Sequence, residues 1–151
     1  MSVSMQPNPD YSLALNKSQL SDYVKEVFPQ AESYQWKIEQ LVPGSIAVSM
    51  EIEKRHLRPG GTVSGPTMFA LADVAAYLVI LGHIGKVALA VTTSLNINFL
   101  SKPPPGNLMA RCSLIKLGKR LAICELHITG VEDEHIVAQA TVTYSIPPKS
   151  T

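Results

Sequence analysis

The sequence predicts an α+β fold in which a curved antiparallel sheet of about six strands wraps around one long central helix, with a short helix before them. Three observations predict this. Residues 64–84, SGPTMFALADVAAYLVILGHI, form an apolar run of helical length. Two strand-like segments precede this run and four follow it. Consecutive strands are joined by short connections, which favour antiparallel pairing with a helix laid across one face of the sheet.

The first element is a short helix within residues 16–28, NKSQLSDYVKEVF, where apolar residues recur at helical spacing. Asn16 followed three residues later by Gln19 resembles a capping box, and Pro29 ends the helix. Residues 1–15 are polar and contain proline, so we expect a flexible leader there. Residues 16–148 are expected to form a single domain, because a chain of 151 residues suits one hydrophobic core.

The strands are indicated by alternation and by the turns between them. SYQWKIEQLV (33–42) and SIAVSMEIE (45–53) flank Pro43–Gly44, a hairpin turn signal. A polar loop leads into the central helix, which we expect over residues 66–82, since Pro66 suits a first helical turn. Four further strands are predicted at VALAVTTSLNINFL (87–100), NLMARCSLIKL (107–117), RLAICELHITG (120–130) and HIVAQATVTYSI (135–146).

Composition argues against several classes of function. Hydrophobic residues make up 46% and charged residues 17% of the chain, and the formal net charge is +1. The chain therefore offers no basic field for nucleic acid and no polybasic run for a membrane surface. Val74–Leu81, the longest uninterrupted apolar stretch, is shorter than the roughly 20 residues of a spanning helix. The start of the chain lacks the pattern of a secretory signal, and Cys112 and Cys124 form no disulfide framework, so we expect a cytoplasmic protein.

Asp73 is the feature of the apolar run that asks for an explanation. It is the only carboxylate between Pro66 and His83, and a charge in such surroundings is costly unless it is paired, hydrogen-bonded or used in catalysis. It lies two helical turns past Pro66, on the helix face that also carries Phe69 or Ala70. The histidines and cysteines show no metal-ligand spacing, and Ser64 does not lie in a nucleophile elbow. We therefore expect neither a metal site nor a Ser-His-Asp triad.

Two segments together resemble a known family. HLRPGGTVSGPTMFALADVAAY (56–77) followed by TTSLNINFLSKPPPG (92–106) is similar to the hotdog-fold acyl-CoA thioesterases of the PaaI-like, phenylacetate-degradation type. The matching residues are Gly65, Leu71, Ala72, Asp73, Asn96, Phe99, Leu100 and Gly106. The resemblance extends over about residues 33–147. In two places the chain departs from the pattern, because Ser64 occupies the family's histidine position and Pro66 its second glycine position.

The resemblance implies hydrolysis of an acyl-CoA thioester, with coenzyme A entering as part of the substrate and no separate cofactor. It assigns the backbone N–H of Gly65 to polarising the thioester carbonyl, and Asp73 to the role of nucleophile or general base. A helix start supplies unpaired N–H groups, and a Cβ at position 65 would obstruct the carbonyl. We also expect an unusual turn geometry at Ser64–Gly65. In the family the two groups come from different subunits, which implies a homodimer or a tetramer built from dimers.

Other residues are candidates at the same site. Thr92 lies where relatives carry a Ser or Thr that orients water or the carboxylate, although it is equally an ordinary strand threonine. The candidates for contact with substrate are Ser64, Pro66, Arg58, Phe69, Asn98, Lys102, Lys119 and Arg120. The cations Lys102, Lys119 and Arg120 suit the phosphates of coenzyme A, or are simply solvated charges. Phe69, Met68 and Tyr77, which lie near Asp73 in the sequence, favour a medium-chain or aryl acyl group.

Alternatives from other classes stay open. The replacements at Ser64 and Pro66 are compatible with a hotdog protein that binds an acyl thioester without hydrolysing it. Asp73 is equally compatible with a structural carboxylate hydrogen-bonded across a subunit interface. A hotdog dehydratase is disfavoured, because it would need a histidine paired with the acid and only His83 lies on the same helix, ten residues further on.

Overall fold

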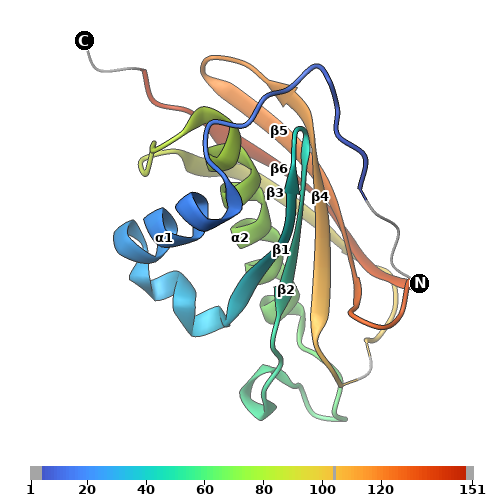
Figure 1. Ribbon diagram of the computed structural model, residues 1–151. Helices are drawn as coiled ribbons and strands as arrows, with labels where there is room; N and C mark the ends of the chain where they lie inside the picture. Colours follow the sequence, from blue (N-terminus) through green and yellow to red (C-terminus); the bar gives the residue numbers. More distant parts are fainter. Residues whose placement is uncertain (1–4, 104, 149–151) are drawn as a thin grey trace.

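The structure is a computed structural model that describes residues 5–103 and 105–148. Six antiparallel strands form one sheet in the order β1-β2-β4-β5-β6-β3. The strands are β1 (Trp36–Val42), β2 (Ser45–Met50), β3 (Val91–Phe99), β4 (Leu108–Leu117), β5 (Leu121–Gly130) and β6 (Ile136–Ser145). The sheet curves around the long helix α2 (Gly65–Ile84), as Figure 1 shows. This confirms the predicted α+β hotdog arrangement.

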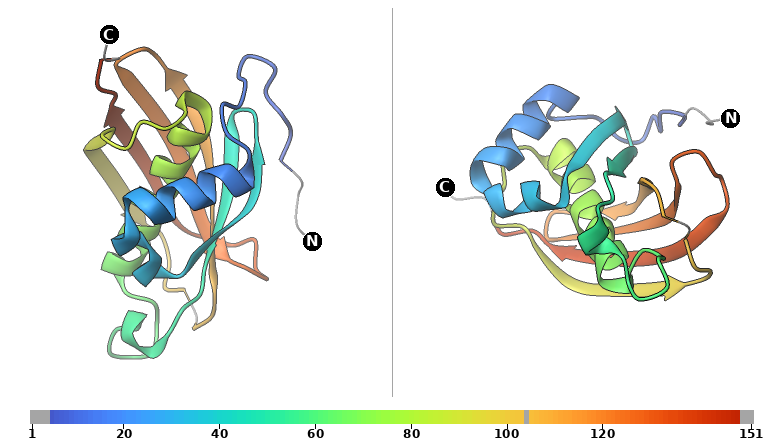
Figure 2. Two further views of the ribbon diagram at one scale, coloured as in Figure 1. Left: turned by 60° about the vertical axis from the view of Figure 1, so that its left-hand side comes forward. Right: turned by 90° about the horizontal axis from the view of Figure 1, so that it is seen from below.

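The N-terminal helix α1 (Lys17–Val27) packs beside α2 (Figure 2). Its capping box is confirmed, because the Gln19 N–H donates to Asn16 Oδ1 at 2.8 Å and the Asn16 N–H donates to Gln19 Oε1 at 2.9 Å. A 3₁₀ helix, η1 (Pro29–Tyr34), follows at the predicted proline. The first strand consequently begins later than expected. Gln35 takes a left-handed conformation with φ 50° that breaks the chain direction, so β1 starts at Trp36 and not at Ser33.

The central helix is buried on nearly every side, which explains why its sequence shows no polar face. By length and composition alone α2 could cross a membrane, so the expectation that no apolar segment is long enough was wrong. The stretch Val74–Leu81 is bounded by Asp73 and Gly82, whereas the helix continues through both residues. Within the fold, however, 67% of its most apolar window is buried, as in the core helix of a globular domain. Its apolar side chains belong to the single core shared with α1 and the sheet.

One buried histidine ties the far end of α2 to the hairpin between β1 and β2. His83 Nδ1 bonds the Val79 carbonyl at 2.7 Å, and its Nε2 accepts the Gly44 N–H at 2.8 Å. Burial lowers the pKa of His83, so the ring stays neutral and keeps its acceptor nitrogen. Residues 5–15, part of the expected leader, lie at the same corner, where the N–H groups of Ala14 and Leu15 donate to the Gly82 carbonyl. The flexibility expected for residues 1–15 stays a prediction.

Candidate functional site

Asp73 lies on the one stripe of α2 that remains accessible. The residues of α2 from Pro66 to Tyr77 that keep partial or full exposure are Pro66, Phe69, Ala70, Asp73, Val74 and Tyr77. Their spacing of three to four residues is that of one helix face, and it is the face expected for Asp73. The carboxylate is therefore half-buried, with one side in the fold and the other open to a substrate.

Two hydroxyl groups hold the carboxylate of Asp73 through the same oxygen. Thr92 Oγ1 donates to Oδ1 at 2.6 Å, and the Tyr144 hydroxyl donates to Oδ1 at 3.0 Å. Thr92 on β3 and Tyr144 on β6 are directly paired across the sheet, which brings both hydroxyls to one point. Within residues 5–103 and 105–148, no hydrogen bond reaches Oδ2. One carboxylate oxygen is thus anchored while the other is free to react.

Tyr144 was not found from the sequence. Its side chain is buried, with 3% exposure, and its ring stacks on Tyr77 with centroids 6.1 Å apart. Burial raises the pKa of Tyr144 far above its ordinary value, and the negative charge of Asp73 raises it further. The phenol therefore stays protonated and donates. A tyrosine in a buried strand must find a partner for its hydroxyl, which is a usable signal, but the sequence does not say which partner.

Gly65 is the first residue of α2, and its amide is available. Ser64 caps the helix, because the Thr67 N–H donates to Ser64 Oγ at 3.3 Å and the Met68 N–H donates to the Ser64 carbonyl at 3.2 Å. Pro66 has no N–H to offer. Among the described residues, no acceptor is bonded to the Gly65 N–H. The first turn of α2 therefore presents a single unpaired backbone donor at the positive end of the helix dipole.

One of the two reasons expected for a glycine at position 65 was wrong. Gly65 is helical and does not have a positive φ, so the expected unusual turn geometry at Ser64–Gly65 was wrong. A Cβ at this position would instead lie 3.2 Å from Cζ of Phe99, on strand β3. A side chain at position 65 would therefore crowd an aromatic ring from an element that follows it in the chain.

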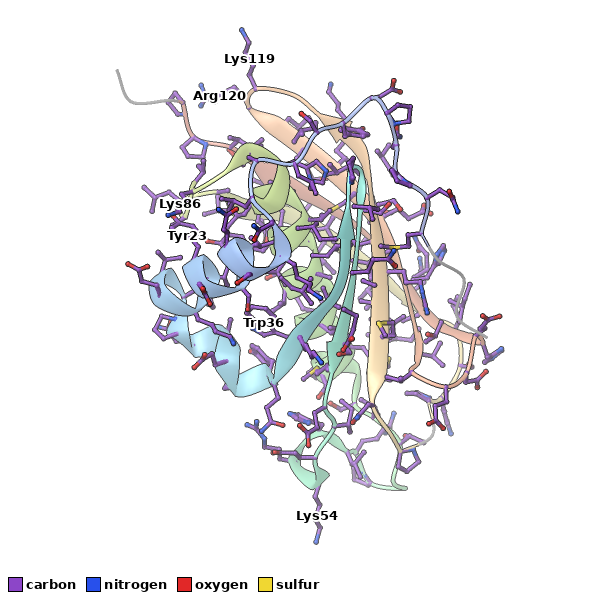
Figure 3. The ribbon with its side chains drawn as sticks, viewed as in Figure 1. Tyr23, Trp36, Lys54, Lys86, Lys119 and Arg120 are labelled. Carbon is purple, nitrogen blue, oxygen red and sulfur yellow. The ribbon has the colours of Figure 1, made fainter. Side chains whose placement is uncertain are left out.

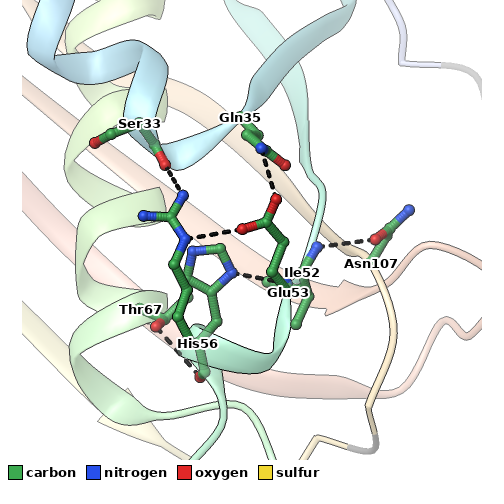
Figure 4. Close-up of polar contacts among 8 residues, drawn as sticks. Ser33, Gln35, Ile52, Glu53, His56, Thr67 and Asn107 are labelled. Atoms are coloured by element: carbon green, nitrogen blue, oxygen red, sulfur yellow. Dashed lines mark hydrogen bonds and ion pairs between the residues drawn. The ribbon is translucent and has the colours of Figure 1, made fainter.

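The loop before α2 is anchored by a polar cluster that fixes the helix start (Figure 4). The carbonyl of His56, in the 3₁₀ helix η2 (Lys54–His56), accepts the Ser64 N–H at 2.9 Å and the Thr67 hydroxyl at 3.4 Å. His56 Nδ1 accepts the Glu53 N–H at 2.9 Å. Burial lowers the pKa of His56, and the nearby Arg55 cation lowers it further, which keeps the ring neutral. The Gly65 amide is thereby held by a rigid support.

A groove of about 430 Å³ opens beside the Gly65 amide. It brings together four of the predicted site residues, Arg58, Gly65, Pro66 and Lys102. Its other lining residues are Thr62, Val63, Met68, Phe99, Leu100, Ser101 and Pro103. The groove thus combines an apolar wall, an unpaired amide and two cations, which suits an elongated ligand with an apolar part and anionic groups.

Other predicted contact residues lie elsewhere. Lys119 and Arg120 line a second groove, of about 1280 Å³, together with Lys86 near the C-terminal end of α2. Figure 3 shows Lys119 and Arg120 at the end of the molecule opposite Lys54, with Lys86 further down the side, beside Tyr23. Arg120 Nε donates to the Ile146 carbonyl at 3.0 Å. Asn98 on β3 donates to Gln139 Oε1 at 2.9 Å. Within one chain, the predicted phosphate-binding cations are therefore divided between two ends of the fold.

The two predicted catalytic groups are also apart within one chain. Gly65 and Asp73 are eight positions apart on one helix, which corresponds to about 12 Å along the axis. This separation is large compared with the about 3 Å at which a reacting carbonyl must lie from each of two groups that act on it. Among the described residues, no group of three or more His, Cys, Asp or Glu side chains is placed to hold a metal ion.

Comparisons of the sequence and the structure with known proteins identify a matching family and several similar proteins. Residues 60–137 match the sequence profile of the family described as the thioesterase superfamily. A proposed thioesterase from Silicibacter sp. TM1040 is 45% identical, with a TM-score of 0.85, over 93% of this chain and 97% of that one. A mutant of the phenylacetic acid degradation protein PaaI from Thermus thermophilus is 28% identical, with a TM-score of 0.68, over 79% of this chain and 99% of that one. A proposed esterase from Thermoplasma acidophilum is 23% identical over 92 residues, which are 61% of this chain and 69% of that protein.

Proposed function

The chain belongs to the thioesterase superfamily, and on this basis we propose that it hydrolyses an acyl-CoA thioester to coenzyme A and a carboxylic acid. The observation that carries the proposal is the carboxylate of Asp73, anchored through Oδ1 and free at Oδ2 on the accessible stripe of α2. Such a carboxylate serves either as a nucleophile or as a general base on water. The likeness to PaaI supports a PaaI-like thioesterase in particular.

In the proposed reaction the Gly65 N–H donates to the thioester oxygen as negative charge develops there. Oδ2 of Asp73 either attacks the carbonyl carbon or removes a proton from the attacking water. A new C–O bond forms, the C–S bond breaks, and the thiolate of coenzyme A leaves and takes up a proton. In the nucleophile form, water then hydrolyses the acyl-aspartate. Thr92 holds the carboxylate in place for either route.

We propose that each active site is shared between two subunits. The separation of Gly65 from Asp73 along α2 requires it if both groups act on one carbonyl. Strand β3 is an edge of the sheet, carries no charged residue, and exposes apolar side chains such as Val91 (55% exposed) and Phe99 (52% exposed). Edge strands without charge or proline readily pair with another chain. We therefore expect a homodimer joined through β3, or a tetramer built from such dimers.

Intersubunit complementation tests this assembly. Asp73→Asn and Gly65→Pro are each expected to be nearly inactive alone, whereas a co-expressed mixture should regain activity. Half of statistically mixed dimers are mixed, and each mixed dimer carries one site free of both changes, so about a quarter of wild-type activity is expected. The molar mass from light scattering should be a multiple of the 16.4 kDa chain. An active monomer, or a mixture no more active than its parts, would contradict the shared site.

The substrate is proposed from the residues around the two catalytic groups. Arg58 and Lys102 in the groove beside Gly65 are placed to meet the phosphates of coenzyme A. Lys119 and Arg120 remain candidates for the same role only if a partner subunit brings them to the site. Phe69, which is 43% exposed on the stripe of Asp73, favours an aryl or medium-chain acyl group. Two buried free thiols, Cys112 and Cys124, support a cytoplasmic location.

A second function, binding of an acyl thioester without hydrolysis, is favoured by one observation. Ser64 and Pro66 replace the family's histidine and second glycine, so the first turn of α2 has only one free donor. Release of free thiol from a panel of aryl-CoA and straight-chain acyl-CoA esters decides between the two. We expect turnover with at least one member of the panel. Saturable binding of these esters without thiol release would favour the carrier.

A further inference from the structure

We propose that Tyr144 is a positioning residue of the reaction, and that together with Thr92 it locks Oδ1 of Asp73 so that Oδ2 is the atom that reacts. This inference rests on the proposed function. It adds a residue that neither the sequence pattern nor the family resemblance indicates. It also identifies which of the two carboxylate oxygens faces the substrate.

The Tyr144 hydroxyl contacts both the side chain and the backbone of Asp73, and its one proton is shared between the two acceptors. The hydroxyl lies 3.0 Å from Oδ1 and 3.3 Å from the backbone carbonyl oxygen of the same residue. Thr92 Oγ1 occupies a second position on Oδ1, at 2.6 Å. A carboxylate oxygen has about two lone-pair sites, so these donors fill Oδ1 and leave Oδ2 for water or the thioester.

Tyr144 is the rigid member of this pair of donors. Thr92 is exposed on the edge strand β3, whereas the Tyr144 ring is almost fully buried and stacks on Tyr77 at an interplanar angle of 27°. Tyr77 is held in turn, because its hydroxyl donates to the Ala88 carbonyl at 2.9 Å. The phenol of Tyr144 therefore cannot rotate away from Asp73 without disrupting packed aromatic side chains.

The same surroundings define what Tyr144 does chemically. Since burial and the charge of Asp73 raise its pKa, the phenol does not release its proton to the leaving thiolate. It is a permanent hydrogen-bond donor and not a general acid. If Asp73 acts as a base, its proton arrives at Oδ2, and Oδ1 can then still accept from both hydroxyls. The lock therefore persists in both protonation states of the carboxyl group.

The test is the change Tyr144→Phe, which keeps the ring and its stacking on Tyr77 but removes the donor. A hydrogen bond to a charged group contributes more free energy than one between neutral groups. We therefore expect kcat to fall by about 10-fold to 100-fold. KM should stay within about twofold, because the substrate contacts are unchanged.

Tyr23→Phe is the matched control. It also removes the hydroxyl of a partly buried tyrosine. This hydroxyl accepts the Ala88 N–H at 3.1 Å and does not contact Asp73. We expect its kcat and KM to match the wild type. Thr92→Val is a second variant, which removes the other hydrogen bond to Oδ1 of Asp73 from an exposed position. It should show the same kind of kcat loss even if Tyr144→Phe fails to fold.

The outcomes separate this inference from the function on which it rests. If Asp73→Asn is inactive while folded Tyr144→Phe keeps its kcat, the positioning role of Tyr144 is overturned and the hydrolase proposal stands. The same conclusion follows from an unchanged Thr92→Val if Tyr144→Phe does not fold. If Asp73→Asn is itself fully active, the proposed function fails. Equal losses in Tyr144→Phe and Tyr23→Phe would mean that the loss reflects general packing, and would also overturn the lock.

Discussion

Asp73→Asn should fold and assemble normally while losing about 100-fold or more in kcat, the loss expected for a positioned base or nucleophile. The amide oxygen of asparagine can replace Oδ1 and accept from both Thr92 and Tyr144. Only the free oxygen, Oδ2, is replaced. The amide NH₂ group in its place neither attacks the thioester carbonyl nor takes up a proton. Acyl-CoA should still bind, because the Gly65 amide and the cations Arg58 and Lys102 remain. Steady-state kinetics and thermal melting of this one variant measure both effects.

A structural role for Asp73 predicts the opposite pattern. If Oδ2 accepts a hydrogen bond across a subunit interface, the amide would break that bond and lower the melting temperature. Any oligomer that survived would then keep its activity. A destabilised but fully active Asp73→Asn would therefore end the catalytic assignment, whereas a stable and inactive variant would exclude the structural role.

The second large effect is expected at Gly65. Gly65→Pro removes the unpaired amide, and an oxyanion donor contributes on the order of 3 kcal/mol, or about 100-fold in rate. Proline is otherwise well suited to the first helical position, where its fixed φ fits. The new side chain also meets Phe99, 3.2 Å from the position of a Cβ. Gly65→Ala is the matched control, because it brings the same Cβ against Phe99 but keeps the N–H.

The rates of these variants separate sterics from chemistry. We expect Gly65→Ala to lose part of the activity by crowding Phe99 and Gly65→Pro to lose much more. Pro66→Gly should stay within a few-fold of wild type, because position 66 donates no hydrogen bond. If Gly65→Ala and Gly65→Pro are equally impaired, the loss is steric and the amide is not the donor. Equal losses in Gly65→Pro and Pro66→Gly, with both folded, would mean that the donor is misassigned.

Several elements could be predicted from the sequence because their determinants are local. The capping box of Asn16 and Gln19, the turn at Pro43–Gly44 and the apolar helix each depend on residues within a few positions of one another. The candidate pair Asp73 and Gly65 could be found for the same reason, since a lone carboxylate and a helix start lie within a single segment. The predicted position of Thr92 also placed it at Asp73, through the family pattern of the following strand.

Other features were decided only by the tertiary structure, because they depend on strand register and on contacts between distant segments. Tyr144 reaches Asp73 only because β6 pairs with β3 in the register that sets Tyr144 opposite Thr92. The ring of Phe99, which a Cβ at position 65 would crowd, comes from β3, and no local rule reveals that contact. Likewise, Lys102 and Lys119 look equivalent in the sequence, but the curved sheet carries them to opposite ends of α2. Local spacing determines which face of an element a residue occupies, whereas pairing between elements determines what that face meets.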